Sequence, residues 1–316
     1  MTASSTGPNR HLGWVTPDPE KGKGSIGTGV RAKPLAPEQW EEFQEIAAIM
    51  GEIRPWIIDF LTLEKDYREV ERLKDDLHSR FSAVPHPAPG DAVVIVETFV
   101  TVQRALSNFL SSANAFREKA RNRLVRRYGR ESLQVRGFES AISEARINAF
   151  AFRFLWFLSN YSLHNESPIS AIPVSDARDD NGELTLSVRV EIKRDMILRS
   201  LKPTMRKQDK ELISLHDELT AQPEAIPLLP LAEEYMKQHG ELFHVIIASH
   251  QDRLARFSRY AQAVLQSAGQ PNDAKPVIWE GADPPDGIST AKTYAFSFGE
   301  FELLMKTLER WQQVES

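Results

Sequence analysis

The residues that could carry chemistry gather at the end of one strongly apolar segment. Residues 149–158 are apolar except for Arg153, and Asn160, Tyr161 and His164 follow directly. Asn160 and His164 are four residues apart, so on one helix they lie on the same face, one turn apart. Histidine is the side chain most often used for proton transfer near neutral pH. Asn160 and His164 are therefore the candidate catalytic residues. The alternative is that His164 is a structural residue that bonds backbone carbonyls at the helix end.

This segment and part of the helix before it resemble a family of bacterial helical proteins. The resemblance rests on NFLSSA at 108–113 and on FRFLWFLSNYSLHNESPIS at 152–170. Members of that family carry arginine directly before Asn-Tyr, histidine three residues after Tyr, and then Pro-Ile-Ser. That arrangement resembles the RX4–6H signature of HEPN domains. His164 matches the histidine, Asn160 matches the polar residue, and Ser159 stands at the arginine position.

The resemblance implies an RNA-directed, metal-free protein from a defence or toxin-type system. In HEPN ribonucleases the histidine helps to activate the ribose 2′-hydroxyl, the arginine stabilises charge on the scissile phosphate, and two motifs meet across a homodimer. Ser159 departs from this pattern, because a neutral hydroxyl does not replace a guanidinium group on phosphate. Loss of such a donor costs ~3–4 kcal/mol of transition-state stabilisation. The resemblance therefore leaves both RNA cleavage and RNA binding alone open.

Arg153 is the one charged residue in the apolar segment. A buried guanidinium group is costly unless it is paired, so we expect a carboxylate on a neighbouring helix, and Glu97 is one candidate. Arg153 and His164 lie ~16 Å apart along a helix that rises 1.5 Å per residue. They therefore do not form one catalytic pair within a monomer.

A cluster of cationic residues forms a second candidate site. Residues 117–136 contain eight Lys and Arg against two Glu, whereas the whole chain has a net charge of −5. Such a local concentration favours binding of a nucleic-acid backbone. The alternative is a solvated helix end whose arginines complement the helix dipole. The predicted nucleic-acid contacts are Arg117, Arg121, Arg123, Arg126, Arg127 and Arg130.

Apolar periodicity predicts a mainly α fold, an up-and-down helical bundle with an inserted β-hairpin. Strict alternation at 184–192, together with the turn dipeptide Asn181-Gly182, predicts the hairpin at about 171–193. The predicted helices span about 37–81, 91–128, 137–164, 223–268 and 298–314. Residues 1–36 are rich in Gly, Pro, Ser, Thr and Lys and predict a disordered tail. The remainder, 37–316, is predicted to form one HEPN-like domain.

The composition excludes several classes of site. The chain has no cysteine, so disulfides, thiolate metal sites and a cysteine nucleophile are absent. Neither a secretory signal nor an uninterrupted apolar run of ~18 residues is present. We expect a cytoplasmic protein without a membrane span, metal or cofactor, with RNA as its partner. The alternative function is a non-catalytic helical scaffold or subunit that docks a protein partner.

Overall fold

The computed structural model describes residues 10–17, 26–82, 92–164, 169–178, 184–204, 210–268, 275–281, 292–295 and 298–312. Within these ranges the chain is mainly helical, which confirms the predicted fold class. It divides into two compact units, where the sequence predicts one domain. Unit 1 comprises Met1–Pro55 and His250–Gln312, and unit 2 comprises Trp56–Ser249 with Gln313–Ser316. Helix α1 (Pro37–Ser82) contributes residues to both units, so its unbroken periodicity gives no sign of the boundary.

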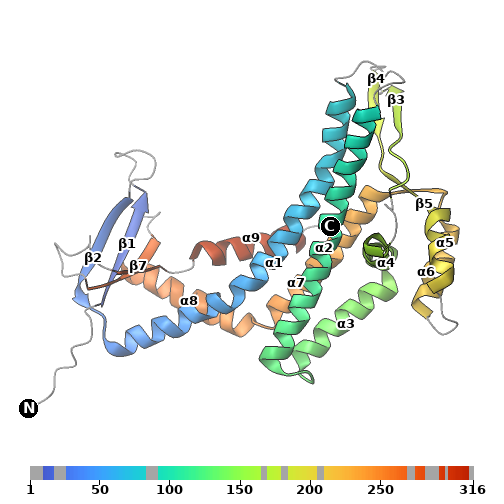
Figure 1. Ribbon diagram of the computed structural model, residues 1–316. Coiled ribbons are helices and arrows are strands. Elements are labelled where there is room, and N and C mark those ends of the chain that lie inside the picture. The colour runs from blue at the N-terminus through green and yellow to red at the C-terminus, as the bar shows by residue number, and fades with distance from the viewer. Residues whose placement is uncertain are drawn as a thin grey trace, which may run out of the picture. The chain divides into compact units, whose positions relative to one another are not determined.

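Unit 1 contains a four-stranded antiparallel sheet with the strand order β2-β1-β7-β8 (Figure 1). The strands are β1 (Arg10–Pro17), β2 (Ile26–Pro34), β7 (Lys275–Glu280) and β8 (Lys292–Ala295). The unit's helices are α8 (Gln251–Ala268), α9 (Phe298–Gln312) and the first part of α1. Helix α9 confirms the helix predicted at 298–314.

Strands β1 and β2 lie in the segment predicted to be a disordered tail, and that prediction is wrong for these two strands. Strand β1 pairs with β7, which follows it by more than 250 residues, so that Leu12 lies opposite Ile278. Both of these side chains are buried. The tail has too little apolar surface of its own to offset the entropy of ordering. The burial of Leu12 comes from pairing with the distant strand β7. The composition of residues 1–36 alone does not reveal that pairing.

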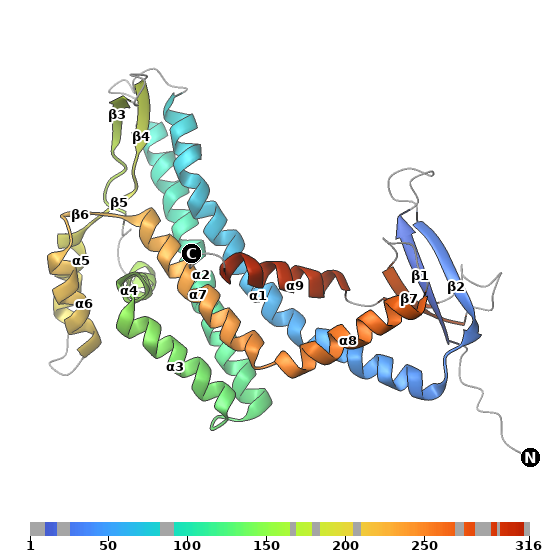
Figure 2. The same ribbon diagram turned by 180° about the vertical axis from the view of Figure 1, so that it is seen from behind.

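Unit 2 is a helical assembly that carries two small antiparallel strand pairs (Figures 1 and 2). Its remaining helices are α2 (Ala92–Tyr128), α3 (Leu133–Asn148), α4 (Phe150–His164), α5 (Arg194–Thr204), α6 (Lys210–Ala221) and α7 (Leu228–Ala248). Strands β3 (Val174–Arg178) and β4 (Leu184–Val188) form the predicted hairpin, and β5 (Glu191–Lys193) pairs with β6 (Ala225–Pro227). Figure 2 shows α5 and α6 as a pair beside α4, and α4 contacts α6 directly.

Two helices predicted from periodicity are each divided in the structure. The helix predicted at 137–164 breaks at Ala149, whose extended backbone (φ −110°, ψ 111°) separates α3 from α4. The helix predicted at 223–268 breaks at Ser249 and His250, between α7 and α8. Apolar residues continue on both sides of each break, so the pattern alone does not reveal an interruption of one or two residues.

Helix α4 lies at the centre of unit 2, as its apolar sequence predicts. It packs against α2, α3, α6 and α7. Its fully buried side chains include Phe152, Phe154, Leu155 and Leu158. Burial of each such side chain contributes roughly 1.5–3 kcal/mol. These side chains therefore anchor α4 in the core of unit 2.

Helix α2 is, within the described residues, long and apolar enough between Val93 and Tyr128 to cross a membrane by length and composition alone. Core helices of soluble proteins pass the same test, and 33% of the most apolar window of α2 is buried. Its first turns carry three exposed valines, Val93, Val96 and Val100, at spacings of three and four. These valines form one apolar face that the described part of the chain leaves uncovered, called the valine face below.

Candidate functional site

The structure separates the residues of the sequence motif. Ser159 is buried, with 2% of its surface exposed, whereas the next residue, Asn160, is exposed. Adjacent residues on an α-helix point about 100° apart, which accounts for this divergence. His164 is the last residue of α4, and its side chain lies outside the described part of the structure. The proposed pairing of Asn160 with His164 therefore stays a prediction.

Hydrogen bonds to Trp156 and Asn114 are among the contacts that hold Ser159 inside unit 2. Its Oγ donates to the backbone carbonyl of Trp156 (2.8 Å) and accepts from Nδ2 of Asn114 on α2 (2.8 Å). The carbonyl oxygen of the Asn114 amide accepts from the guanidinium group of Arg117. The position at which the family carries arginine is thus linked to an arginine from another helix.

Arg117 lies at the centre of this buried network. It is only 4% exposed, so it does not contact nucleic acid, and the prediction of a surface contact is wrong for this residue. Its Nη1 donates to the hydroxyl of Tyr235 (2.6 Å) and to Nε2 of His239 (2.7 Å). Its Cζ lies 4.1 Å from the ring centroid of Trp156. Arg117 follows Ala113 by four residues on the apolar face of α2, a helical spacing that indicates burial.

The charge of Arg117 is not balanced by any carboxylate that the described residues bring into contact with it. Nδ1 of His239 donates to the carbonyl of Tyr235 (2.7 Å), which leaves Nε2 as an acceptor for Arg117. Burial, and then the charge of Arg117, hold the pKa of His239 well below its usual value. Burial raises the pKa of Tyr235, and Arg117 opposes that rise. Both rings therefore stay neutral, and the cluster carries one positive charge.

Arg153 has a structural task that the sequence indicates only in part. Its Nη2 donates to both carboxylate oxygens of Glu218 on α6 (2.6 Å each). Its Nη1 donates to the carbonyls of Arg146 and Ile147, which end helix α3. The expected carboxylate partner exists, but the candidate Glu97 is wrong, because Glu97 is exposed on α2. Arg153 thus caps the open C-terminus of α3, where a cation is favoured by the helix dipole.

An open cavity of about 170 Å³ lies beside this cap. Helices α3 and α4 provide its polar and aromatic lining, and α6 provides its leucines. The lining residues are Arg146, Arg153, Trp156, Phe157, Asn160, Leu212 and Leu215. Cζ of Arg146 lies 4.8 Å from the ring centroid of Trp156, the same ring that Arg117 contacts. Among the predicted site residues, Asn160 lines this cavity. No sequence spacing links α6 to the other two helices, so the cavity was not predictable.

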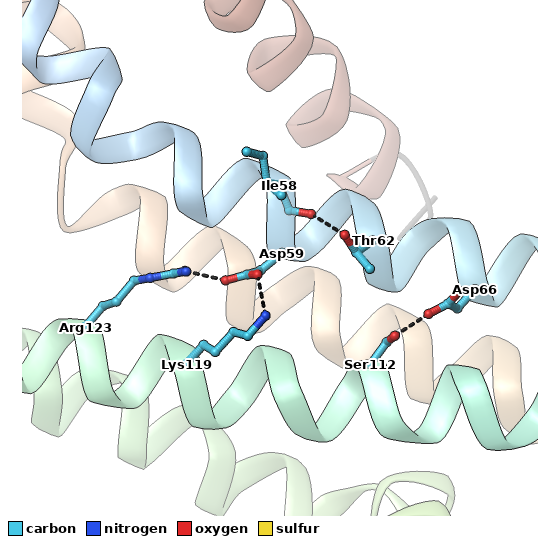
Figure 3. Close-up of polar contacts among 7 residues, drawn as sticks. All are labelled: Ile58, Asp59, Thr62, Asp66, Ser112, Lys119 and Arg123. Atoms are coloured by element: carbon cyan, nitrogen blue, oxygen red, sulfur yellow. Dashed lines mark hydrogen bonds and ion pairs between the residues drawn. The ribbon is translucent and has the colours of Figure 1, made fainter.

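The basic end of α2 is partly neutralised by acidic residues. Lys119 and Arg123 both pair with Asp59 of α1, as Figure 3 shows. Figure 3 also shows the hydrogen bond from Ser112 to Asp66, which joins the same two helices. These contacts show that part of the predicted basic site serves to hold α1 against α2.

The other predicted arginines of this cluster differ in their surroundings. Arg121 pairs with Glu139 of α3 (2.8 Å), and Arg127 lies over the ring of Tyr128. Arg126 and Arg130 are exposed, and neither forms an ion pair with the residues that the structure describes. These two arginines are the ones best placed to meet a polyanion.

The fold and the sites define a mainly α protein in which Arg117, Tyr235 and His239 form a buried cluster. An aromatic cavity lies beside α4. No protein-family model matches the chain, and comparison with curated proteins and with solved structures gives no significant match.

Proposed function

We propose that this protein is a HEPN-like RNA-binding protein of a bacterial defence or toxin-type system, which binds single-stranded RNA without cleaving it. The observation that carries the binding is a pair of exposed arginines, Arg126 in the last turn of α2 and Arg130 in the turn that follows this helix. They stand out on a chain with a net charge of −5. Exposed guanidinium groups bind phosphates and release counterions from the nucleic acid.

The surroundings of Ser159 support binding without cleavage. Its hydroxyl is neutral and is committed to Trp156 and Asn114, so it does not replace the phosphate-stabilising arginine of the family pattern. Arg117, which Asn114 links to Ser159, is enclosed by Tyr235 and His239. The proposal includes cytoplasmic action as a homodimer, because the HEPN site is composite. If multi-angle light scattering finds a single species with the mass of a monomer, the homodimer part of the proposal is refuted.

The deciding experiment measures RNA binding by fluorescence anisotropy at several salt concentrations. Binding of a labelled single-stranded RNA by the double variant Arg126→Gln/Arg130→Gln should be at least tenfold weaker. The slope of log K against log salt should fall by about 1.4, since each lost phosphate contact on a single strand is worth ~0.7. The matched control is Arg72→Gln/Arg199→Gln, which removes two exposed arginines from other helices. Equal affinities for the two double variants would refute the proposed surface.

The valine face supports a second candidate function, a helical subunit that docks a protein partner. Val93, Val96 and Val100 are each at least 60% exposed, and buried apolar side chains drive association. The partner would present an apolar helix face of matching spacing. A stoichiometric partner that wild type retains and Val96→Asp/Val100→Asp releases would favour this function. If repeated native purifications recover no such partner, the docking function is refuted.

A further inference from the structure

We infer that the cavity beside α4 binds one nucleotide, with its phosphate at Arg146 and Arg153 and its base against Trp156. This inference deepens the proposed function, on which it rests, by assigning a second contact to the RNA strand. The cavity measures about 170 Å³ and opens to solvent. That volume is below the ~300–1,000 Å³ typical of drug-sized ligand sites. The cavity therefore suits one planar group with one anionic group attached.

Arg153, one of the residues that line this cavity, has a buried hydrogen-bond donor that no described residue satisfies. The side chain of Arg153 is only 8% exposed, and its other donors bind Glu218 and the end of α3. Its Nε–H has no acceptor among the described residues. Buried donors are nearly always satisfied, and an exception calls for a ligand or water. A phosphate oxygen is the acceptor that a guanidinium group binds best.

The electrostatic field at the cavity favours an anion. Arg153 and Glu218 neutralise each other. The charge of Arg117, which lies against the ring of Trp156, meets only neutral groups in the described part of the chain. A buried cation that lacks a counter-charge projects its field strongly through a low-dielectric interior. Arg117 thus places a fixed positive charge against the ring of a residue that lines the cavity.

The remaining lining residues suit a nucleobase. Trp156 and Phe157 give the cavity an aromatic lining, and aromatic side chains contact bases regardless of sequence. The exposed amide of Asn160 both donates and accepts hydrogen bonds, as the edge of a base requires. Leu212 and Leu215 of α6 provide an apolar wall. Phosphate and base recognition therefore meet in one cavity.

The test is isothermal titration calorimetry on the full chain with four probes: adenosine 5′-monophosphate, adenosine, inorganic phosphate and a short single-stranded RNA. Wild type should bind the monophosphate at least tenfold more tightly than adenosine or phosphate. Arg146→Met should weaken binding of the monophosphate and of the RNA by about tenfold or more, as expected for a lost charge-assisted hydrogen bond. Arg72→Met, which removes an exposed arginine from α1, should change both affinities by less than about twofold.

Three outcomes overturn the inference: no saturable binding of the monophosphate or the RNA, equal affinities of Arg146→Met and wild type, or phosphate binding as tight as monophosphate binding. If Arg146→Met is less well folded, Asn160→Trp fills the cavity from an exposed position and should cause the same loss. If Arg146→Met weakens RNA binding and Arg126→Gln/Arg130→Gln does not, the cavity binds RNA and the proposed RNA contact at Arg126 and Arg130 is refuted. If only Arg126→Gln/Arg130→Gln weakens RNA binding, the inference about the cavity is refuted and the proposed function stands.

Discussion

The amide of Asn114 donates a 2.8 Å hydrogen bond to Oγ of Ser159 and accepts one from Arg117 through its carbonyl oxygen. One side chain on α2 therefore joins the motif position on α4 to the buried arginine. The link explains why a small hydroxyl residue fits at this position. A long cationic side chain at 159 would meet a second guanidinium group where the packing is closed.

Replacement of Ser159 by arginine should destabilise the protein and should not restore ribonuclease activity. The new side chain would overpack a site with 2% exposure and add an unpaired charge beside Arg117, at a cost of about 3 kcal/mol or more. Urea denaturation and an RNA cleavage assay in EDTA measure the two effects. Ser159→Ala is the control, with an expected loss of about 1 kcal/mol. A stable Ser159→Arg protein that cleaves RNA would contradict both the structure at this position and the proposed absence of activity.

The cap that Arg153 forms on α3 should contribute substantially to stability. Arg153→Met removes the ion pair with Glu218 and the donors to Arg146 and Ile147, and it should lower the free energy of unfolding by about 2–4 kcal/mol. Glu218 keeps its hydration because it is partly exposed, so the loss stays below that of a fully buried charge. Arg136→Met serves as the control and should stay within about 0.5 kcal/mol of wild type. A loss below about 1 kcal/mol for Arg153→Met would show that the cap is not stabilising.

Stability should decrease as the pH falls below the ordinary pKa of histidine, about 6.5. The pKa of His239 in the folded state is lowered, chiefly by burial and then by Arg117, so the unfolded chain binds a proton that the folded chain does not. The contribution of neutral His239 to folding stability is complete above the pKa that this histidine has in the unfolded chain. It is lost as the pH decreases below that pKa. This group adds a slope of at most ~1.4 kcal/mol per pH unit.

Urea titrations between pH 7.5 and 5.5 measure this slope. His239→Gln should lower stability at every pH, because it disturbs the contact with Arg117, but it should make the curve flatter than that of wild type. Parallel curves for the two proteins would show that His239 does not set the pH dependence.

Release of Lys119 and Arg123 from Asp59 should strengthen RNA binding. Asp59→Asn removes the carboxylate that neutralises both cations, and it should raise RNA affinity several-fold and steepen the salt dependence by up to about 1.4. The ion pairs between α1 and α2 are partly exposed, so the loss of stability should be about 1 kcal/mol. Glu71→Gln, which removes one of the two carboxylates that pair with Arg68 elsewhere on α1, is the control and should leave affinity unchanged. Unchanged RNA affinity in Asp59→Asn would place the RNA away from this end of α2.

The predicted role of His164 has its own test. His164→Ala should leave RNA uncleaved, as wild type does, and should alter RNA binding only if this side chain reaches the strand. If wild type cleaves RNA in EDTA and His164→Ala does not, the protein is an enzyme and binding without cleavage is refuted. Anisotropy and gel-based cleavage assays on the same RNA provide both measurements.

The sequence predicted the elements that depend on local periodicity. Helices α1, α2 and α9, the β3–β4 hairpin and the central place of α4 all follow from apolar spacing within one segment. The N-terminal strands could not be predicted, because Leu12 gains its burial from Ile278. The break at Ala149 was not visible either, since apolar residues continue on both sides of it.

By itself the sequence determined which residues carry charge and which helices must be buried, because both follow from side-chain chemistry and from the 3.6-residue repeat. It placed a polar cluster at the end of α4 and a basic cluster at the end of α2. Only the tertiary structure decided what each charge does. Arg117 is enclosed by Tyr235 and His239, Arg153 caps α3 and meets Glu218, and Arg126 remains exposed. These outcomes depend on contacts between segments up to 122 residues apart, and the spacing of residues along one helix does not contain that information.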